Sequence, residues 1–535
     1  MEAPSAAVGA GGFYARQATG LVREIGISSN VALNISFISL PLAALVATQA
    51  PFAFPGASIV LVVVLAAVLS IVPTLLYGWL GTTMPRSGGD YVFVSRIMNP
   101  VIGFAANFNI TMWYVLVASQ FASLLAPFGL SAALATIGAG TGNQTLVDWS
   151  ATVAGKGWQF GLGAAALVLT AVLVSVSLRV WTRIFMLLFL LSMVGVAIAV
   201  LLMIIHGRGD FQSSLTRFGT SYGGIIQAAR KAGYTGGGTF SLKQTVAAAN
   251  LAFASFGYAI VTTYAGGEVR SPRRTLLRAL LLALAISFVV VLVMMVLAAR
   301  TLGQDFLGSV TYLSNVDPAH YPLAAPPFYF LFAAMLTKSS LLIIVMAISF
   351  ALAFFVGQPA TFLIATRSLF AWSFDRILPD KVSSVNERTH SPLIANTIVL
   401  VLSVGYLGLI VYGPSRFLQL VFTAGIGETL TFLVVAVAGA IFPWRRRRLY
   451  AESPIARRLF GLPAITVIGV LAFGVYLLFM IPLMLNDALG ANARTGIVAT
   501  VVLALAPFLI YGISYVVNRR RGVDLSLAFR ELPPE

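Results

Sequence analysis

Long apolar stretches recur along the whole chain, and the short segments between them carry most of the charged residues. A helix of about twenty apolar residues spans the hydrocarbon core of a bilayer. The pattern therefore predicts an all-α, polytopic membrane protein with twelve transmembrane helices. The expected spans lie near residues 27–48, 58–83, 101–128, 158–178, 183–206, 245–267, 276–300, 340–372, 392–413, 417–442, 462–485 and 495–517.

Positive charge is distributed unevenly between the two sides of this arrangement. If the N-terminus is cytoplasmic, 24 of the 34 Lys and Arg residues fall inside and the other 10 outside. Short cytoplasmic loops of membrane proteins carry this excess of Lys and Arg. We therefore expect both termini in the cytoplasm of a multi-pass plasma-membrane protein. The arginine run at residues 445–448 is expected to contact anionic lipid head groups.

Composition excludes several kinds of protein. The chain is 59% hydrophobic and 10% charged, and the sidedness of its positive charge explains the net charge of +17 better than nucleic-acid binding does. The absence of cysteine excludes disulfides, thiolate metal sites and thiol nucleophiles. No phosphate-binding glycine-rich loop with its lysine is present. We expect no cofactor, no catalytic residues and no nucleic-acid partner.

The first and sixth spans contain residues that interrupt a helix. Span six, within residues 251–278, carries serine, threonine and glycine in its apolar body and runs into Glu268 and four arginines. Span one carries Asn34, Ser36 and Ser39, and Pro41 removes a backbone donor. Lipid does not satisfy a disrupted backbone, so such breaks indicate a cavity-lining transport site. Their separation by five spans predicts two inverted five-helix repeats.

This interpretation divides the chain into six parts. They are a cytoplasmic tail at 1–26, a first repeat at 27–206, an extracellular loop at 207–244, a second repeat at 245–442, helices eleven and twelve at 443–517, and a cytoplasmic tail at 518–535.

Three segments resemble the amino acid–polyamine–organocation superfamily of permeases. They are PRSGGDYVFVSR at 85–96, FASFGYAIVTTYAGGEVRSPRRTLLRA at 253–279, and ATRSLFAWSFDRILPDKVSSVNERTHSPLIAN at 365–396. The resemblance implies the fold of the leucine transporter, with five-plus-five inverted repeats and discontinuous helices one and six. It also implies an amino acid permease that works by alternating access.

The resemblance further implies a substrate site at the two breaks. Family members unwind helix one at a Gly-Ser-Gly five residues before a proline, and counting back from Pro41 gives Asn34, Ile35 and Ser36. The first glycine and the last are absent here. Phe253 and Tyr258 would cover the substrate, and Ala259 replaces a glutamate that many members carry. The implied substrate-binding residues are Asn34, Ile35, Ser36, Phe37, Phe253, Ser255, Phe256, Gly257 and Tyr258.

Other polar residues have a functional and a purely structural interpretation. Glu428 is a carboxylate in the body of span ten and is a candidate for proton coupling. Ser349 is a candidate for a sodium site. Glu268 and Arg270 form either an inner gate or a static salt bridge. Asn109, Trp113 and Gln358 line the cavity or serve helix packing.

The sequence leaves several functions open. The first is a secondary active transporter for an amino acid or related amine, coupled to H⁺ or Na⁺ or exchanging without an ion. A polyamine or organocation transporter would need several cavity carboxylates, and one candidate is present. A membrane receptor on the same fold would bind without transporting. An intramembrane enzyme is disfavoured because paired acid–base or metal groups are absent from the spans.

Overall fold

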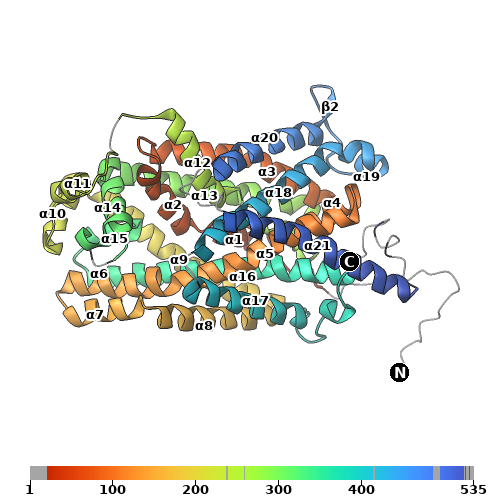
Figure 1. The fold of residues 1–535 in the computed structure, drawn as a ribbon, viewed down its shortest axis with the longest axis horizontal. Helices are drawn as coiled ribbons and strands as arrows, with labels where there is room; N and C mark the ends of the chain where they lie inside the picture. Colours follow the sequence, from red (N-terminus) through yellow and green to blue (C-terminus); the bar gives the residue numbers. More distant parts are fainter. Residues whose placement is uncertain are drawn as a thin grey trace.

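The computed structural model describes residues 21–236, 239–257, 259–323, 325–413, 416–485 and 494–522, with Leu525 and Phe529. The described chain is a bundle of long helices that run roughly along its long axis (Figure 1). One small hairpin of strands β1 (Arg458–Leu459) and β2 (Leu462–Pro463) lies at its edge.

Eleven helices of the described residues are long and apolar enough to cross a membrane. This confirms a polytopic, mainly α-helical membrane protein. They are α1 (Ile27–Ile38) with α2 (Leu40–Ala53), α3 (Ile59–Thr83), α5 (Pro100–Leu124) continuing through η1 (Leu125–Ser131) into α6 (Ala132–Thr141), α8 (Lys156–Ser175), α9 (Leu178–Ile205), α13 (Pro272–Thr301), α16 (Ser340–Phe374), α17 (Leu393–Tyr412), α18 (Arg416–Arg445), α20 (Ala464–Leu485) and α21 (Arg494–Arg520).

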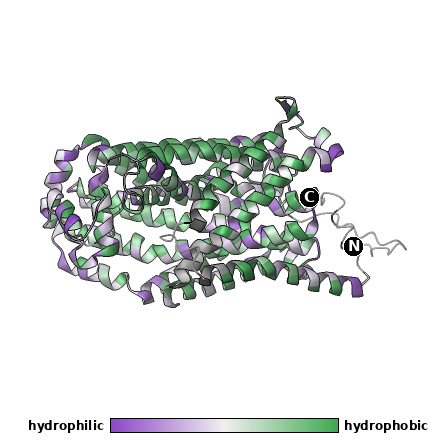
Figure 2. Cartoon of the chain, turned by 45° about the horizontal axis from the view of Figure 1, so that its top comes forward, coloured by the Kyte–Doolittle hydropathy of each residue, from purple (hydrophilic) through white to green (hydrophobic). Residues whose placement is uncertain are grey.

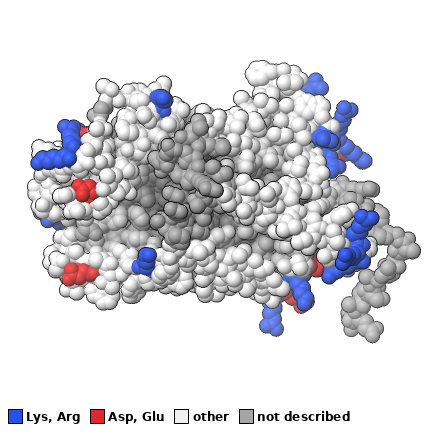
Figure 3. Space-filling model, in the orientation of Figure 1, with Lys and Arg blue, Asp and Glu red and all other residues white. Residues whose placement is uncertain are grey.

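Hydropathy is arranged as a bilayer requires. Hydrophobic residues fill the middle of the bundle and polar residues mark its two ends (Figure 2). Charged side chains likewise gather toward the ends (Figure 3). Large apolar side chains such as Leu187 on α9 and Val289 on α13 are exposed on the flanks. Such an apolar surface is favourable in contact with lipid and unfavourable in contact with water.

The first expected span is broken, but not at the position that the resemblance to the permease superfamily implied. Asn34, Ile35, Ser36 and Phe37 all lie within α1. The expected unwinding at 34–36 is therefore wrong. The chain turns at Ser39, whose φ of 51° is left-handed. Pro41 follows in the first turn of α2 and has no N–H to donate back to α1, so the irregular residue lies just ahead of it, two positions earlier.

The sixth expected span is helical only in its first part. Helix α12 (Leu242–Phe256) has 15 residues, too few to cross a bilayer of ordinary thickness. The chain then continues through two short turns, η3 (Val261–Thr263) and η4 (Gly266–Glu268), before α13 begins. This confirms the predicted interruption.

Short elements cover the two ends of the bundle (Figure 1). The end that we call the α11 end carries α7 (Gln144–Val153), α10 (Arg208–Leu215), η2 (Thr216–Phe218), α11 (Tyr222–Lys231), α14 (Gln304–Val316), η5 (Pro318–His320) and α15 (Tyr329–Met335). The opposite end, which we call the α4 end, carries α4 (Asp90–Ile97), η6 (Asp380–Ser383), α19 (Arg447–Ala451) and the hairpin.

Candidate functional site

The two interrupted segments lie side by side and are joined by a polar network. The Asn34 amide donates hydrogen bonds to the Asn30 carbonyl oxygen at 2.8 Å and to the Thr262 hydroxyl at 2.9 Å. Thr262 in turn donates to the Asn30 side-chain oxygen at 2.6 Å. All three side chains are buried. Asn34 thus fastens α1 to η3, whereas Ser36 donates to the Ala32 carbonyl inside α1.

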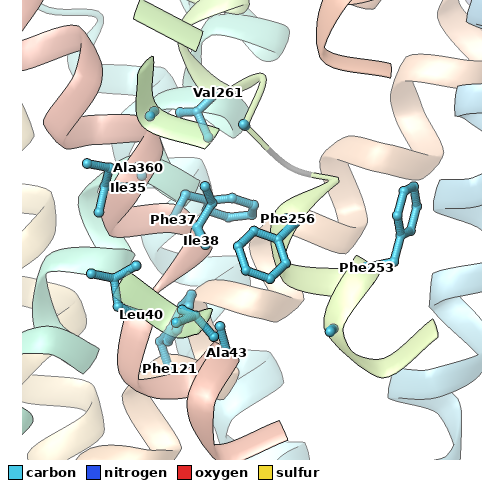
Figure 4. Close-up of a cluster of buried hydrophobic side chains, with 14 of the residues drawn as sticks. Ile35, Phe37, Ile38, Leu40, Ala43, Phe121, Phe253, Phe256, Val261 and Ala360 are labelled. Atoms are coloured by element: carbon cyan, nitrogen blue, oxygen red, sulfur yellow. The ribbon is translucent and has the colours of Figure 1, made fainter. Parts of the chain in front are cut away.

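The break in the first span faces the end of α12. Phe37 and Ile38 at the end of α1, and Phe256 at the end of α12, point into the space between the two helices (Figure 4). The Ser39 hydroxyl is buried and has no hydrogen-bond partner among the described residues. A buried hydroxyl costs free energy unless something binds it. Ser39 is therefore a better-placed candidate for ligand contact than Ser36.

The helix ends at these breaks carry opposite partial charges. Helix α2 starts at Leu40, so its N-terminal dipole favours an anion. Helix α12 stops at Phe256, and the free carbonyls of a helix C-terminus favour a cation. One end therefore suits a carboxylate and the other an ammonium group.

Aromatic side chains define the surroundings of the breaks. The Tyr114 ring on α5 contacts Phe37 edge-on at 5.4 Å and Tyr264 at 5.9 Å between ring centroids. Phe253, expected as a lid over the substrate, instead stacks on Phe479 of α20 at 3.8 Å. It lies farther from α1 than Phe256 does (Figure 4), on the side of α12 that packs against α20.

Two other expected cavity residues pack between helices. Gln358 is buried on α16 and accepts a hydrogen bond of 3.2 Å from Thr170 of α8, so it faces α8 and not the breaks. Ser349 lies where α16 crosses α9, against Gly195, whose missing side chain leaves room for it. Both positions have a structural explanation in helix packing.

The remaining expected residues give a mixed result. Asn109 donates to the Ala105 carbonyl at 3.1 Å within α5 and lies near Gly427 of α18. The Trp113 indole nitrogen is buried without a partner in the described part of the chain. Ser255 and Gly257 close α12, and the Gly257 N–H donates to the Phe253 carbonyl at 2.8 Å. Tyr258 lies outside the described residues.

Glu428 is buried on α18. Its carboxyl lies within electrostatic range of the hydroxyls of Tyr114 on α5 and Tyr476 on α20. One turn farther along α18, Phe432 stacks on Tyr476 at 5.0 Å between centroids. Glu428 therefore belongs to a tyrosine-rich cluster within the bundle, near the Tyr114 ring that contacts Phe37.

Glu268 forms a buried ion pair, but not with Arg270. Its carboxylate accepts two hydrogen bonds from Arg367 of α16, through Nε and, at 2.8 Å, through Nη2. Arg270 is exposed, and its backbone N–H bonds to Ile25. Fork-like arginine geometry favours such a two-point contact, which ties the end of the sixth segment to α16.

A second ion pair lies close by at the α4 end. Arg96 of α4 donates to Asp375 at 2.7 and 3.0 Å, and the Tyr91 hydroxyl also donates to Asp375 at 2.7 Å. All three side chains are buried. This cluster fixes α4 against the end of α16.

Asp90 is a buried carboxyl group that the sequence analysis did not identify. It lies in a separate cluster, in which all the side chains that donate hydrogen bonds to it are uncharged. Its Oδ2 accepts from the Tyr264 hydroxyl at 2.8 Å and from the Tyr77 hydroxyl at 3.4 Å, and its Oδ1 accepts from Asn107. The indole of Trp372 donates to the Asn107 oxygen at 2.7 Å, which fixes the amide so that its nitrogen faces Asp90. Asp90 is 1% exposed.

The two glycines before Asp90 explain how it reaches Tyr264. Gly88 and Gly89 have φ of +106° and +52°, and the Gly88 N–H donates to the Tyr264 carbonyl at 2.9 Å. A Cβ at Gly89 would lie 2.7 Å from the Tyr264 ring. Glycine at both positions permits this close approach. The Gly-Gly-Asp sequence was the available signal for this contact.

Residues in contact with the breaks left weaker signals. Thr262 and Arg367 are single polar residues in apolar segments, and the sequence alone does not pair them with Asn34 and Glu268. Ser39 lies two residues before Pro41, which marks a break but not its geometry. Among the described residues, no group of three or more His, Asp or Glu side chains could hold a metal ion.

A lateral cavity of about 680 Å³ lies between α1, α9 and α13. Its wall is apolar and includes Ile35, Phe189 and the exposed side chain of Val289. The cavity therefore opens toward the flank of the bundle, away from the polar groups of the breaks.

Comparison with known proteins places this architecture in a family. No curated protein matches the chain. The model of the amino acid permease family, however, matches residues 25–515, from two residues before α1 to within α21. The match covers both interrupted segments and both buried ion pairs. The chain therefore belongs to the amino acid permease family and is a membrane transport protein.

Proposed function

We propose that this permease is a secondary active transporter that moves an amino acid or related amine across the plasma membrane by alternating access. The observation that carries the proposal is the meeting of the two interrupted segments, fastened to each other through Asn34 and Thr262. Irregular backbone within a membrane bundle is stable where it lines a site for something other than lipid.

The substrate lies between the Ser39 break and the end of α12. Its carboxylate accepts hydrogen bonds from the first turn of α2 and from the Ser39 hydroxyl, which has no partner in the described chain. Its ammonium group donates to carbonyls at the end of α12, near Phe256 and Gly257. Phe37 contributes apolar surface, whereas Ile35 lines the lateral cavity between α1, α9 and α13. An amino acid zwitterion satisfies both helix ends at once, whereas a polyamine offers no anion.

The topology follows from the same proposal. The sixth span consists of α12 and the turns after it, which gives twelve spans, and the first ten form two inverted five-helix repeats. Both termini are cytoplasmic, so the α4 end faces the cytoplasm. The Glu268–Arg367 pair is then an inner gate, because it joins the sixth segment to α16 on that side.

Proton coupling is the ion coupling that we favour, with Glu428 as the proton acceptor. It is a buried carboxyl near Tyr114, whose ring contacts Phe37 beside the break. An intramembrane carboxyl is costly and is retained for function. Ser349 suits sodium coupling less well, because it packs against Gly195 between α9 and α16.

Purified protein in liposomes tests the function. A panel of amino acids and amines is first screened for thermal stabilisation, and the compounds that stabilise are assayed for uptake. Glu428→Gln is expected to lose uptake driven by an inward proton gradient while it retains exchange. Glu452→Gln, on the exposed loop after α19, is the control and is expected to transport normally.

Three results would contradict parts of the proposal. Stabilisation without uptake would indicate a receptor. No stabilisation and no uptake by any amino acid or amine would overturn the assigned function. Uptake by Glu428→Gln that follows the proton gradient as in the wild type would remove Glu428 from the coupling mechanism.

A further inference from the structure

We propose that Asp90 is a second proton-binding site of this transporter, which works with Glu428 and links proton binding to release of the sixth segment. The inference rests on the proposed function and extends it to a residue outside the interrupted helices. It is carried by the contacts of Asp90, by the lack of a cation among them, and by the element that each contact belongs to.

The donors to Asp90 come from three different elements. Tyr77 belongs to α3, Asn107 to α5, and Tyr264 to the segment between η3 and η4. Asp90 itself starts α4, in the connection between the spans α3 and α5. The Asp90 carboxyl thus adds a side-chain hydrogen bond of 2.8 Å from Tyr264 to the backbone bond between Gly88 and Tyr264 that also holds the interrupted sixth segment.

The described structure gives Asp90 no ion-pair partner. Arg96, on the same helix, is bound to Asp375, the residue after α16. Arg446, between α18 and α19, donates to the Arg96 carbonyl. The other titratable groups around Asp90 are neutral or acidic: Tyr77 of α3, Tyr114 of α5, Tyr264, Tyr476 of α20 and Glu428 of α18. A buried carboxyl among such groups gains no charge compensation and takes up a proton more readily than an ion-paired one.

Burial is the main cause of a changed affinity for protons here. It raises the pKa of Asp90 to about 6, although the hydrogen bonds from Tyr264, Asn107 and Tyr77 act in the opposite direction. This value lies between the pH of an acidified exterior and that of a neutral cytoplasm. Asp90 would therefore change its protonation over the range in which a proton gradient acts.

Asp90 and Glu428 are connected through a short series of rings. Tyr77, which donates to Asp90, packs edge-on against Phe432 at 5.8 Å, and Phe432 stacks on Tyr476 at 5.0 Å. Phe432 and Glu428 lie four residues apart on α18 and therefore share a face. The charges of both carboxyls act on Tyr114 and Tyr476. Both proposed proton sites therefore border the same pair of tyrosines.

Protonation changes what Asp90 can do for Tyr264. The ionised carboxylate accepts from all three donors, whereas a protonated carboxyl has one O–H that must itself donate. A proton that arrives from water forms this O–H bond, and the contact with Tyr264 loses its charge assistance. The sixth segment is then held less firmly at the α4 end, where Glu268 and Arg367 also hold it.

We place the entry of the proton on the same side. A cavity of about 430 Å³ at the α4 end is lined by Thr83, Pro85, Arg86 and residues 271–274. It lies beside the loop that leads through Gly88 and Gly89 to Asp90. The Ser87–Ala265 backbone bridge joins this loop to the sixth segment, so the proposal couples access to Asp90 to movement of that segment.

The proton itself is the probe in the first test. Infrared difference spectra of the purified full-length protein, recorded between about pH 8 and about pH 5, report protonation of buried carboxyls. The wild type is expected to show a carboxyl band with a midpoint near 6, and Asp90→Asn to lose it. Glu452→Gln is the control and retains the band. An unchanged band in Asp90→Asn would overturn the proposal, whether or not the protein transports any amino acid.

Transport provides the second test and separates the two proposals. Liposomes receive a radiolabelled mixture of the common amino acids, with or without an inward proton gradient. Asp90→Asn is expected to exchange substrate as the wild type does. Its rate of gradient-driven uptake is expected to be at least tenfold lower than that of the wild type. Equal gradient dependence in wild type and Asp90→Asn would overturn the role of Asp90. Failure of the wild type to transport would instead contradict the proposed function.

Discussion

The Asn34 amide donates a hydrogen bond of 2.9 Å to the Thr262 hydroxyl across 228 positions of sequence. This bond, with that from Thr262 to Asn30, gives the interrupted sixth segment a fixed place beside α1. A segment without regular backbone pairing depends on such side-chain contacts for its position. The arrangement of the candidate site therefore depends on a few polar side chains.

Thr262→Val should destabilise the protein and loosen the sixth segment. Valine has the shape of threonine but leaves the Asn30 oxygen and the Asn34 amide without this partner, at a cost of about 1–3 kcal/mol. Thermal denaturation of the purified protein measures the loss. Thr263→Val is the matched control, because the Thr263 hydroxyl donates only to the Ile260 carbonyl in its own turn among the described contacts. Equal effects of the two substitutions would contradict this role of Thr262.

Two replacements of Ser39 should distinguish the effect of its left-handed backbone conformation from the effect of its hydroxyl group. Ser39→Gly suits a φ of 51° and is expected to keep or slightly raise stability, but to remove the hydroxyl that we assign to the substrate. Ser39→Val is expected to cost about 1–3 kcal/mol, because a β-branched side chain is strained there.

The measurement for Ser39 is the stabilisation by the best compound of the amino acid panel. Ser39→Gly is expected to weaken apparent affinity about tenfold, which corresponds to the loss of one hydrogen bond of about 1.4 kcal/mol. Affinity that stays at the wild-type value in Ser39→Gly would show that the substrate does not use this hydroxyl.

The ion pair between Glu268 and Arg367 should control access from the α4 end. Glu268→Gln leaves a buried guanidinium without its charged partner, a loss of about 3–5 kcal/mol. The chain has no cysteine, so Ser39→Cys provides a unique reporter thiol. We expect a membrane-impermeant thiol reagent to label it faster from that end when Glu268→Gln is added. The exposed pair of Arg448 and Glu452 supplies a control, and Glu452→Gln should leave the labelling rate unchanged.

The sequence predicted the large features of this fold because bilayer physics dictates them. Spans must be long and apolar, so residues such as 178–205 or 272–301 are recognisable without a structure. The interruptions were also predictable, since Pro41 and the glycine- and threonine-rich sixth span break the helical pattern. The exact irregular residue was not, because Ser39 and Ser36 are chemically alike and only packing selects between them.

The partners of buried polar residues could not be read from the sequence. Glu268 lies close in sequence to Arg270, yet tertiary structure brings it to Arg367, and Arg270 stays exposed. Phe253 and Phe256 are both aromatic, near the break and one helical turn apart, but packing against α20 brings Phe253 onto Phe479. Such choices depend on the relative rotation of helices, which local pattern does not determine.

Asp90 escaped notice for a related reason. It lies in a connection between spans, where carboxylates are ordinarily solvated, and its burial arises because Gly88 and Gly89 bring it against the sixth segment. Gly89→Ala should therefore disturb the contact between this connection and the sixth segment. The added methyl would meet the buried Tyr264 ring, and we expect a loss of about 1–3 kcal/mol in thermal stability. Gly461→Ala is an unsuitable control because of its positive φ, so Gly474→Ala, on α20 with open space around it, serves instead.

The raised pKa of Asp90 also predicts how stability depends on pH. Its folded value of about 6 exceeds the ordinary value of 3.8, so the protonated form is favoured in the folded protein. This contribution is fully present below about pH 4 and is lost as the pH rises through about 6. Above that range the buried charge costs up to about 3 kcal/mol.

Asp90→Asn removes the charge and should raise the denaturation midpoint at about pH 8, with the gain shrinking toward about pH 4. Asp375→Asn, which breaks an ion pair with Arg96, should instead lower the midpoint at about pH 8. A gain in Asp90→Asn that stayed constant across the pH range would show that Asp90 does not titrate there.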